Sequence, residues 1–133
     1  MVTEKNNDYY IGKIKTDLKF IIDHTDGKTQ KDIEADELLK DSIMFRIMCI
    51  SEITDKLTES FKSEHKDIPW SSIIDLSDKI EHFYDSLDFP LFYNSVFNVI
   101  PEIYEKVNDD KKIDTVASII LKEYRDAFEE LAK

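Results

Sequence analysis

The sequence predicts an all-α fold, an up-and-down bundle of four main helices followed by an additional C-terminal helix. Glycine and proline are scarce, with two and three residues in a chain of 133, so the turns that β-strands need between them are largely missing. Apolar residues instead recur at three- and four-residue intervals, which is typical of amphipathic helices. A chain of this length is expected to form one domain, residues 1–133.

The first helix is predicted from an apolar face that ends shortly before Asp26 and Gly27. His24 stands near this end, where a cation complements the negative end of the helix dipole, so we interpret it as a capping residue. Residues 29–35 are expected to form a connecting turn. The apolar face comprises Tyr10, Ile14, Leu18, Ile21 and Ile22.

A long second helix is expected to start after Asp36, a favourable N-cap residue, and to reach about Ser63. Its apolar residues form a stripe wider than one packing face requires, which indicates more than one helix partner. Arg46 within it is interpreted as either a surface cation or a phosphate contact. The stripe comprises Leu38, Leu39, Phe45, Cys49, Ile53, Leu57 and Phe61, widened by Met44, Ile47, Met48 and Ile50.

The third helix is predicted to begin near Asp67, a cap residue, with Pro69 in its first turn, where a missing N–H costs little. It is expected to end near His82. His82 and Tyr84 would point in opposite directions on a continuing helix, so a site shared by both requires that the helix stops there. The alternative is that the two residues share no site. His82 would then only interact with the unpaired backbone carbonyls at the end of the helix, and Tyr84 would be a partly buried phenol that closes the core.

The fourth helix is expected to start after Asp88, with Pro90 in its first turn. Pro101 falls well inside it and removes an amide donor, so a kink or a break is predicted at residues 97–100. Residues 108–112 are interpreted as a linker. A fifth helix is predicted from about residue 114 to 133, and it either covers a groove or extends a dimer interface.

Composition and charge limit the classes of function. The net charge of −11 opposes nonspecific nucleic-acid binding and suits a basic protein partner. The single Cys49 cannot form an internal disulfide, and the histidines and Cys49 do not have metal-ligand spacing, so neither a metal nor a cofactor is expected. No segment has the length of a membrane span and the first residues are polar, so a cytoplasmic protein without membrane contact is expected.

A resemblance to a known family rests on residues 9–103. IPW at residues 68–70, a helix, and then His-x-Tyr at His82 and Tyr84 resemble the HepT-like branch of the HEPN superfamily, all-helical proteins encoded beside minimal nucleotidyltransferases in toxin–antitoxin pairs. The family pattern is an Arg, four residues, then His-x-Tyr, and Ser77 occupies the Arg position here. The segments that resemble its first helix, its long second helix and the helix after His-x-Tyr are YYIGKIKTDLKFIIDHT, DELLKDSIMFRIMCISEITDKL and LDFPLFYNSVFNVIPEI.

The resemblance implies a metal-independent endoribonuclease toxin, an RNA substrate, a homodimer and a nucleotidyltransferase antitoxin that adds AMP to Tyr84. His82 would act as acid or base, Tyr84 would position the substrate, and Lys79 would partly replace the missing Arg as a catalytic cation. Glu52 matches an acidic position of the family, so it either supports the site together with Ser77 or only reaches water. Because Ser77 offers one neutral hydroxyl in place of a guanidinium, the activity is expected to be weakened. The alternative is a catalytically inactive binding module that still engages, and is modified by, the nucleotidyltransferase.

Overall fold

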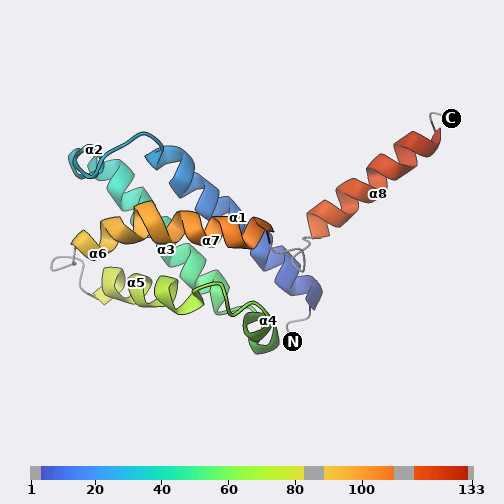
Figure 1. Ribbon diagram of the computed structural model, residues 1–133, viewed down its shortest axis with the longest axis horizontal. Helices are drawn as coiled ribbons and strands as arrows, with labels where there is room; N and C mark the ends of the chain where they lie inside the picture. Colours follow the sequence, from blue (N-terminus) through green and yellow to red (C-terminus); the bar gives the residue numbers. More distant parts are fainter. Residues whose placement is uncertain (1–3, 83–88, 110–115, 132–133) are drawn as a thin grey trace.

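The computed structural model describes residues 4–82, 89–109 and 116–131. Four long helical segments lie side by side, and consecutive segments run in opposite directions (Figure 1). α1 contacts α3 and α7, and α3 contacts α5. The predicted all-α bundle is confirmed, since the residues described contain no strand. The segments are α1 (Glu4–Thr25), α3 (Glu37–Thr54), α5 (Trp70–His82), and a composite helix of α6 (Phe89–Asn94), the π-helix η2 (Ser95–Val99) and α7 (Ile100–Asp109).

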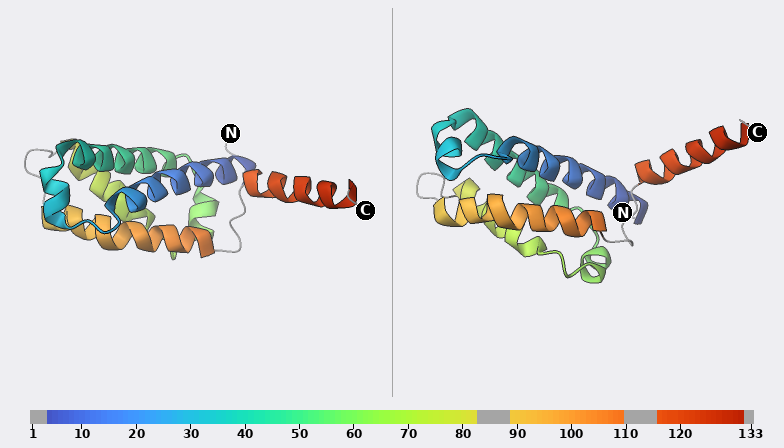
Figure 2. Two further views of the ribbon diagram at one scale, coloured as in Figure 1. Left: turned by 90° about the horizontal axis from the view of Figure 1, so that it is seen from above. Right: turned by 45° about the horizontal axis from the view of Figure 1, so that its top comes forward.

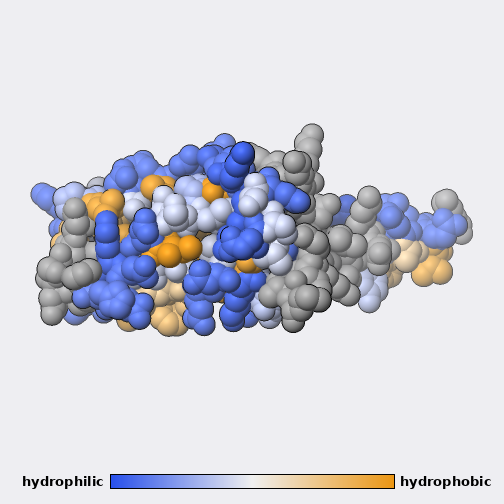
Figure 3. All heavy atoms as spheres, turned by 90° about the horizontal axis from the view of Figure 1, so that it is seen from below, coloured by the Kyte–Doolittle hydropathy of each residue, from blue (hydrophilic) through white to orange (hydrophobic). Residues whose placement is uncertain are grey.

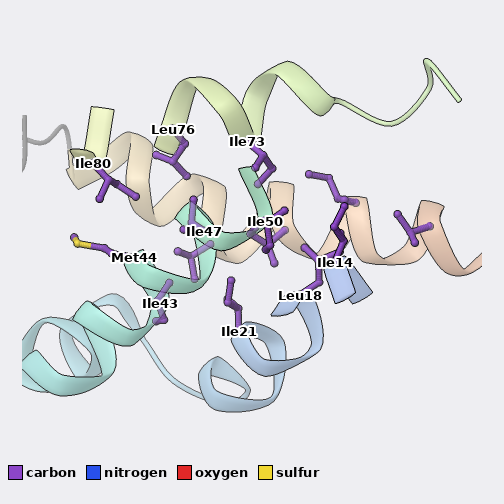
Figure 4. Packing of buried hydrophobic residues seen from close by; sticks show 14 of the residues in the cluster. Ile14, Leu18, Ile21, Ile43, Met44, Ile47, Ile50, Ile73, Leu76 and Ile80 are labelled. Atoms are coloured by element: carbon purple, nitrogen blue, oxygen red, sulfur yellow. The ribbon is translucent and has the colours of Figure 1, made fainter. Parts of the chain in front are cut away.

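The bundle core consists mainly of isoleucine and leucine side chains that face one another from α1, α3 and α5 (Figure 4). Burying one such side chain contributes roughly 1.5–3 kcal/mol, so this core is the main source of the fold's stability. Residues of the cluster include Ile14, Leu18, Ile21, Ile43, Met44, Ile47, Ile50, Ile73, Leu76, Ile80, Phe92 and Ile103.

Residues 29–35 form a short helix, α2 (Gln30–Ala35), so the prediction of a simple turn was wrong. The cause is a capping box, in which the Thr29 hydroxyl accepts from the Asp32 amide at 3.2 Å and the Asp32 carboxylate accepts from the Thr29 amide at 2.8 Å. Each side chain satisfies an amide that has no partner within the helix. Gly27, at φ 72°, supplies the preceding reversal after α1.

α3 starts after Asp36, as predicted, because the Asp36 side chain accepts from the Leu39 amide at 3.0 Å. It ends at Thr54 rather than near Ser63, and α4 (Glu59–Glu64) follows as a separate helix. Thr58 caps α4, and the buried side chain of Asn7 accepts from the Thr58 amide and donates to its hydroxyl, both at 3.0 Å. These hydrogen bonds from α1 hold Thr58 in place as the N-cap of α4, which favours two separate helices over one continuous helix.

The helix that contains Pro101 is interrupted where the sequence predicts it. Residues 95–99 are π-helical, and the Ile100 amide donates to the Ser95 carbonyl, five residues earlier. Pro101 has no amide for the carbonyl four residues before it, and its ring crowds that carbonyl, so the wider turn accommodates both constraints.

α8 (Val116–Leu131) contacts α1 but extends away from the bundle (Figures 1 and 2). Its side chains Tyr124, Phe128 and Leu131 are exposed, and Figure 3 shows a hydrophobic patch on its far part beside a mainly hydrophilic bundle face. None of the helices in the described ranges is long and apolar enough to cross a membrane.

Candidate functional site

His82 is the last residue of α5 and its side chain is exposed. The predicted end of the helix near this residue stays a prediction, because residues 83–88 lie outside the described part of the chain. Within the described part, an imidazole, the side chain most suited to proton exchange near neutral pH, stands at the surface. Tyr84 lies outside the described residues. A site shared by His82 and Tyr84 stays a prediction.

Lys79 and Ser77 occupy opposite sides of α5. Ser77 is buried, whereas Lys79 is exposed, because residues two positions apart on a helix are turned by about 200°. Lys79 and His82, three positions apart, share the exposed side. Lys79 is thus placed to act with His82, but it does not enter the space next to Ser77.

Ser77 and Glu52 line one groove between α3 and α5, with a volume of about 430 Å³. The structure therefore brings together the two residues that the sequence assigns a supporting role. His82 does not line this groove, although its neighbour Glu81 does. The lining residues are Phe45, Met48, Cys49, Ser51, Glu52, Asp55, Ser77, Asp78 and Glu81.

The two walls of the groove carry the same sequence pattern, a serine, then an acidic residue, then a second acidic residue three positions later. Residues 51–55 of the α3 wall read SEITD, and residues 77–81 of the α5 wall read SDKIE. The spacing of one and four residues from the serine brings these side chains toward one side of each helix. Ser51 and Asp55 were not predicted from the sequence, and this repeated pattern was the signal that could have revealed them.

The groove is lined by both polar and apolar residues, and its charged residues are all acidic. The residues that line it include four carboxylates and no lysine or arginine. Burial, followed by the nearby negative charge of Asp17, raises the pKa of the Cys49 thiol, so this cysteine is a poor nucleophile at neutral pH. The described residues contain no cluster of His, Cys, Asp and Glu that could hold a metal ion.

Arg46 is occupied by a structural interaction. Its guanidinium donates to the Asp17 carboxylate on α1 at 2.7 Å and lies 4.1 Å from the centroid of the Phe20 ring. His24 stacks on the ring of the same Phe20, with the ring centroids 4.0 Å apart, and its Nδ1 is 2.8 Å from the Phe20 carbonyl oxygen. This contact at the last turn of α1 agrees with a capping role for His24.

Comparison with protein-family models matches residues 14–109 to the family described as "Ribonuclease HepT-like". α8 lies beyond the matched residues.

Curated proteins with similar sequences cover most of the chain. "Putative RNase TTE0752" of Caldanaerobacter subterraneus subsp. tengcongensis is 24% identical over 100 residues, which are 75% of this chain and 89% of that protein. "Putative RNase MJ0127" of Methanocaldococcus jannaschii is 25% identical over 107 residues, 80% of this chain and 84% of that protein.

A third protein, "Gamma-glutamylcyclotransferase and putative RNase MJ0434" of Methanocaldococcus jannaschii, is 26% identical over 98 residues, 74% of this chain but only 44% of that protein. No solved structure matches the chain significantly.

Proposed function

The chain belongs to the HepT-like ribonuclease family, and we propose that it is the ribonuclease-type member of a toxin–antitoxin module, with an activity weakened by Ser77. The observation that supports the proposal most strongly is the exposed His82 in the last described turn of α5, within the residues that match the family. An exposed imidazole can accept or donate a proton at neutral pH without moving the helix.

The proposed reaction needs no metal. The 2′-hydroxyl of a ribose attacks the adjacent phosphorus, the bond to the 5′-oxygen of the next nucleotide breaks, and a cyclic phosphate forms. His82 takes the proton from the 2′-hydroxyl or supplies one to the departing 5′-oxygen. Lys79, on the same exposed side of α5, places a positive charge near the phosphate oxygens.

Ser77 is the reason for proposing a weakened activity. A guanidinium contacts two phosphate oxygens at once, which a serine hydroxyl cannot do, and loss of one such donor costs roughly a hundredfold to a thousandfold in rate. The groove beside Ser77 also carries Glu52, Asp78 and Glu81, whose charges repel RNA phosphates. RNA would therefore reach His82 from the exposed side that Lys79 shares.

The acidic groove specifically favours a second candidate, a catalytically inactive binding module. In both candidates the family resemblance supports a homodimer and a minimal nucleotidyltransferase as antitoxin partner, which adds AMP to Tyr84. An added AMP would place a negative phosphodiester and a bulky nucleoside close to His82 and so exclude RNA.

The proposal is tested by an RNA cleavage assay with and without EDTA. Wild type should cleave slowly and equally in both conditions, His82→Ala should lose at least about tenfold in rate, and His24→Ala should retain the wild-type rate. His24 is a matched control because it is also exposed and also lies at the end of a helix. Equal rates for wild type and His82→Ala would contradict the catalytic role, and no cleavage by wild type would favour the binding module.

A further inference from the structure

α8 carries large apolar side chains that the rest of the described chain leaves exposed. Tyr124, Phe128 and Leu131 are 63%, 70% and 82% exposed, and their spacing of four and three residues places them on one side of the helix. α8 contacts α1, but its far part extends beyond the bundle, where Figure 3 shows the hydrophobic patch. Neighbouring exposed apolar side chains of this size mark a surface that binds a protein.

A second exposed apolar surface lies on α3. Leu38 and Phe45 are 80% and 59% exposed, and they lie seven residues apart, about two helical turns, so both are on the same side of the helix. A depression of about 310 Å³ is lined by Phe45, by Ser42 and by Phe20 of α1, among others. Ser42 stands one turn after Leu38 and about one turn before Phe45, so the depression reaches the space between these two side chains.

The two surfaces have the same spacing. Tyr124 and Leu131 are also seven residues apart, so on each helix the outer pair of side chains is separated by about 10 Å along the axis. Phe128 stands between Tyr124 and Leu131, at the level where α3 has its depression. If the two helices lie side by side, the outer side chains of α8 meet Leu38 and Phe45, and the Phe128 ring enters the depression. Side chains of one helix commonly pack into the hollows of another in this way.

We propose that α8 of one copy of the chain packs against the exposed apolar side of α3 of a second copy, and that the second copy makes the same contact in return. Within one copy both surfaces are exposed, so they do not cover each other there. Such an exchange has the two-fold symmetry of most dimers, in which each copy gives and receives the same element. The inference rests on the homodimer of the proposed function and adds to it a helix that lies beyond the residues matched to the family.

The area that this exchange covers is close to that of a specific interface. An aromatic side chain buries roughly 150–250 Å² when it is covered completely, and about two thirds of this area is still exposed on Tyr124, Phe128 and Phe45. Each contact would cover these three aromatic side chains together with Leu38 and Leu131. Two such contacts approach the roughly 1,200 Å² of buried surface at which stable, specific interfaces begin.

The test uses two variants that place opposite charges on the two surfaces. The arm variant is Tyr124→Lys with Leu131→Lys, on α8, and the face variant is Leu38→Asp with Phe45→Asp, on α3. In a mixture of the two, the lysines of one copy meet the aspartates of the other, and the unchanged α8 meets the unchanged α3. The equal spacing preserves this match whether the two helices run parallel or antiparallel.

A control variant carries the same added charge outside both surfaces. Ser63→Lys with Ser72→Lys adds two lysines at exposed positions of α4 and α5. Sedimentation equilibrium measures the Kd of the dimer, and native mass spectrometry identifies the two copies in each dimer. Circular dichroism and the Tm establish that each variant is folded.

Each of the two surface variants alone should raise the Kd at least about a hundredfold, because charges replace two apolar side chains in every contact. The control should dimerise like wild type. The mixture of arm and face variants should form a mixed dimer with a Kd within about tenfold of the wild-type value. The mixture of face variant and control should form its mixed dimer at least about tenfold less tightly, since one of its two contacts lacks the opposite charges.

Three results would overturn the proposal. A mixture of arm and face variants that stays monomeric would show that α8 and α3 are not each other's partners. An arm variant that dimerises as tightly as wild type would exclude α8 from the interface, and this result would leave the homodimer of the proposed function intact. A monomeric wild type would remove both the homodimer and the exchange.

Discussion

Arg46 on α3 and Asp17 on α1 form an ion pair, with 2.7 Å between Arg46 Nη1 and Asp17 Oδ1. The Asp17 residue is 8% exposed, and Phe20 covers one face of the guanidinium. The pair therefore joins two core helices at a position where water has limited access. A carboxylate that is shielded from water and has no charged partner raises the free energy of the folded state.

Removal of this arginine should destabilise the bundle. Arg46→Gln leaves the Asp17 carboxylate without its charged partner, and we expect the free energy of unfolding to fall by about 1–3 kcal/mol. Urea denaturation at neutral pH measures the change. The control is Lys19→Gln, which breaks the exposed pair of Lys19 with Asp23 and should cost less than about 1 kcal/mol. An equal decrease in the free energy of unfolding for both variants would show that burial does not strengthen the ion pair of Arg46 with Asp17.

Ser77→Arg should raise RNA cleavage. The new guanidinium supplies the phosphate contact that serine lacks, and an increase approaching a hundredfold is expected if this contact limits the rate. The increase should disappear when His82→Ala is added. Ser51→Arg is the matched control, since it places a guanidinium in the same groove from the α3 wall. Strong and equal cleavage by wild type and Ser77→Arg would show that the arginine is dispensable.

Tyr84 should accept AMP from the minimal nucleotidyltransferase that we propose as the antitoxin partner. A phenol becomes a nucleophile once its proton is removed, and its attack on the α-phosphorus of ATP releases pyrophosphate. Mass spectrometry after incubation with that enzyme, ATP and magnesium should show added AMP on wild type and not on Tyr84→Phe. Tyr9→Phe, which alters an exposed tyrosine of α1, should be modified like wild type. Labelling of Tyr84→Phe to the wild-type extent would place the modification elsewhere.

The capping box of α2 should make this helix sensitive to acid. The hydrogen bond from the Thr29 amide lowers the pKa of Asp32 from its model-compound value of 3.8. A lowered pKa in the folded state means that the ionised carboxylate stabilises the fold above pH 3.8 and that this contribution is lost as the pH falls through the folded-state pKa. Hydrogen exchange of the α2 amides should therefore be slower in wild type than in Asp32→Ala at neutral pH. The difference should vanish once the pH falls below the lowered folded-state pKa of Asp32, and a constant difference at all pH values would exclude the carboxylate as its cause.

The chain should form a homodimer through the exposed apolar side of α3. Leu38 and Phe45, seven residues apart on this helix, are 80% and 59% exposed, and apolar side chains of this size favour burial in an interface. Sedimentation equilibrium at micromolar concentration should give twice the monomer mass of 15.7 kDa. Leu38→Ser with Phe45→Ser should give the monomer, whereas Tyr9→Ser should not. A monomeric wild type would contradict the prediction.

The periodicity of apolar residues predicted the long helices because packing in this bundle follows the helical repeat closely. It did not predict the break after Thr54. That break depends on Asn7, which is distant in sequence and reaches Thr58 only in the folded chain. The π-helical interruption at residues 95–99 was predictable, since proline disturbs the hydrogen bonding of its own helix.

The candidate site was predictable only in part, for a similar reason. The position of His82 on α5 followed from local signals, whereas the groove requires α3 and α5 to pack against each other. Glu52 and Ser77 were assigned by family resemblance, and only the packing of the two helices shows that they line one groove. The exposed side of α5 that Lys79 occupies and the burial of Ser77 both follow from helical geometry, because Ser77 lies four residues after Ile73 and three before Ile80 on the apolar side of the helix.

The extension of α8 away from the bundle has a hydrodynamic consequence. A helix of 16 residues is about 24 Å long, so a monomer with this arm is elongated and experiences more friction in solution than a sphere of the same mass. Gel filtration separates by hydrodynamic radius and would therefore overestimate the mass of the monomer. An elution volume close to that of a compact dimer does not distinguish one copy with an extended arm from two copies without it, whereas sedimentation equilibrium does, because its result is independent of shape.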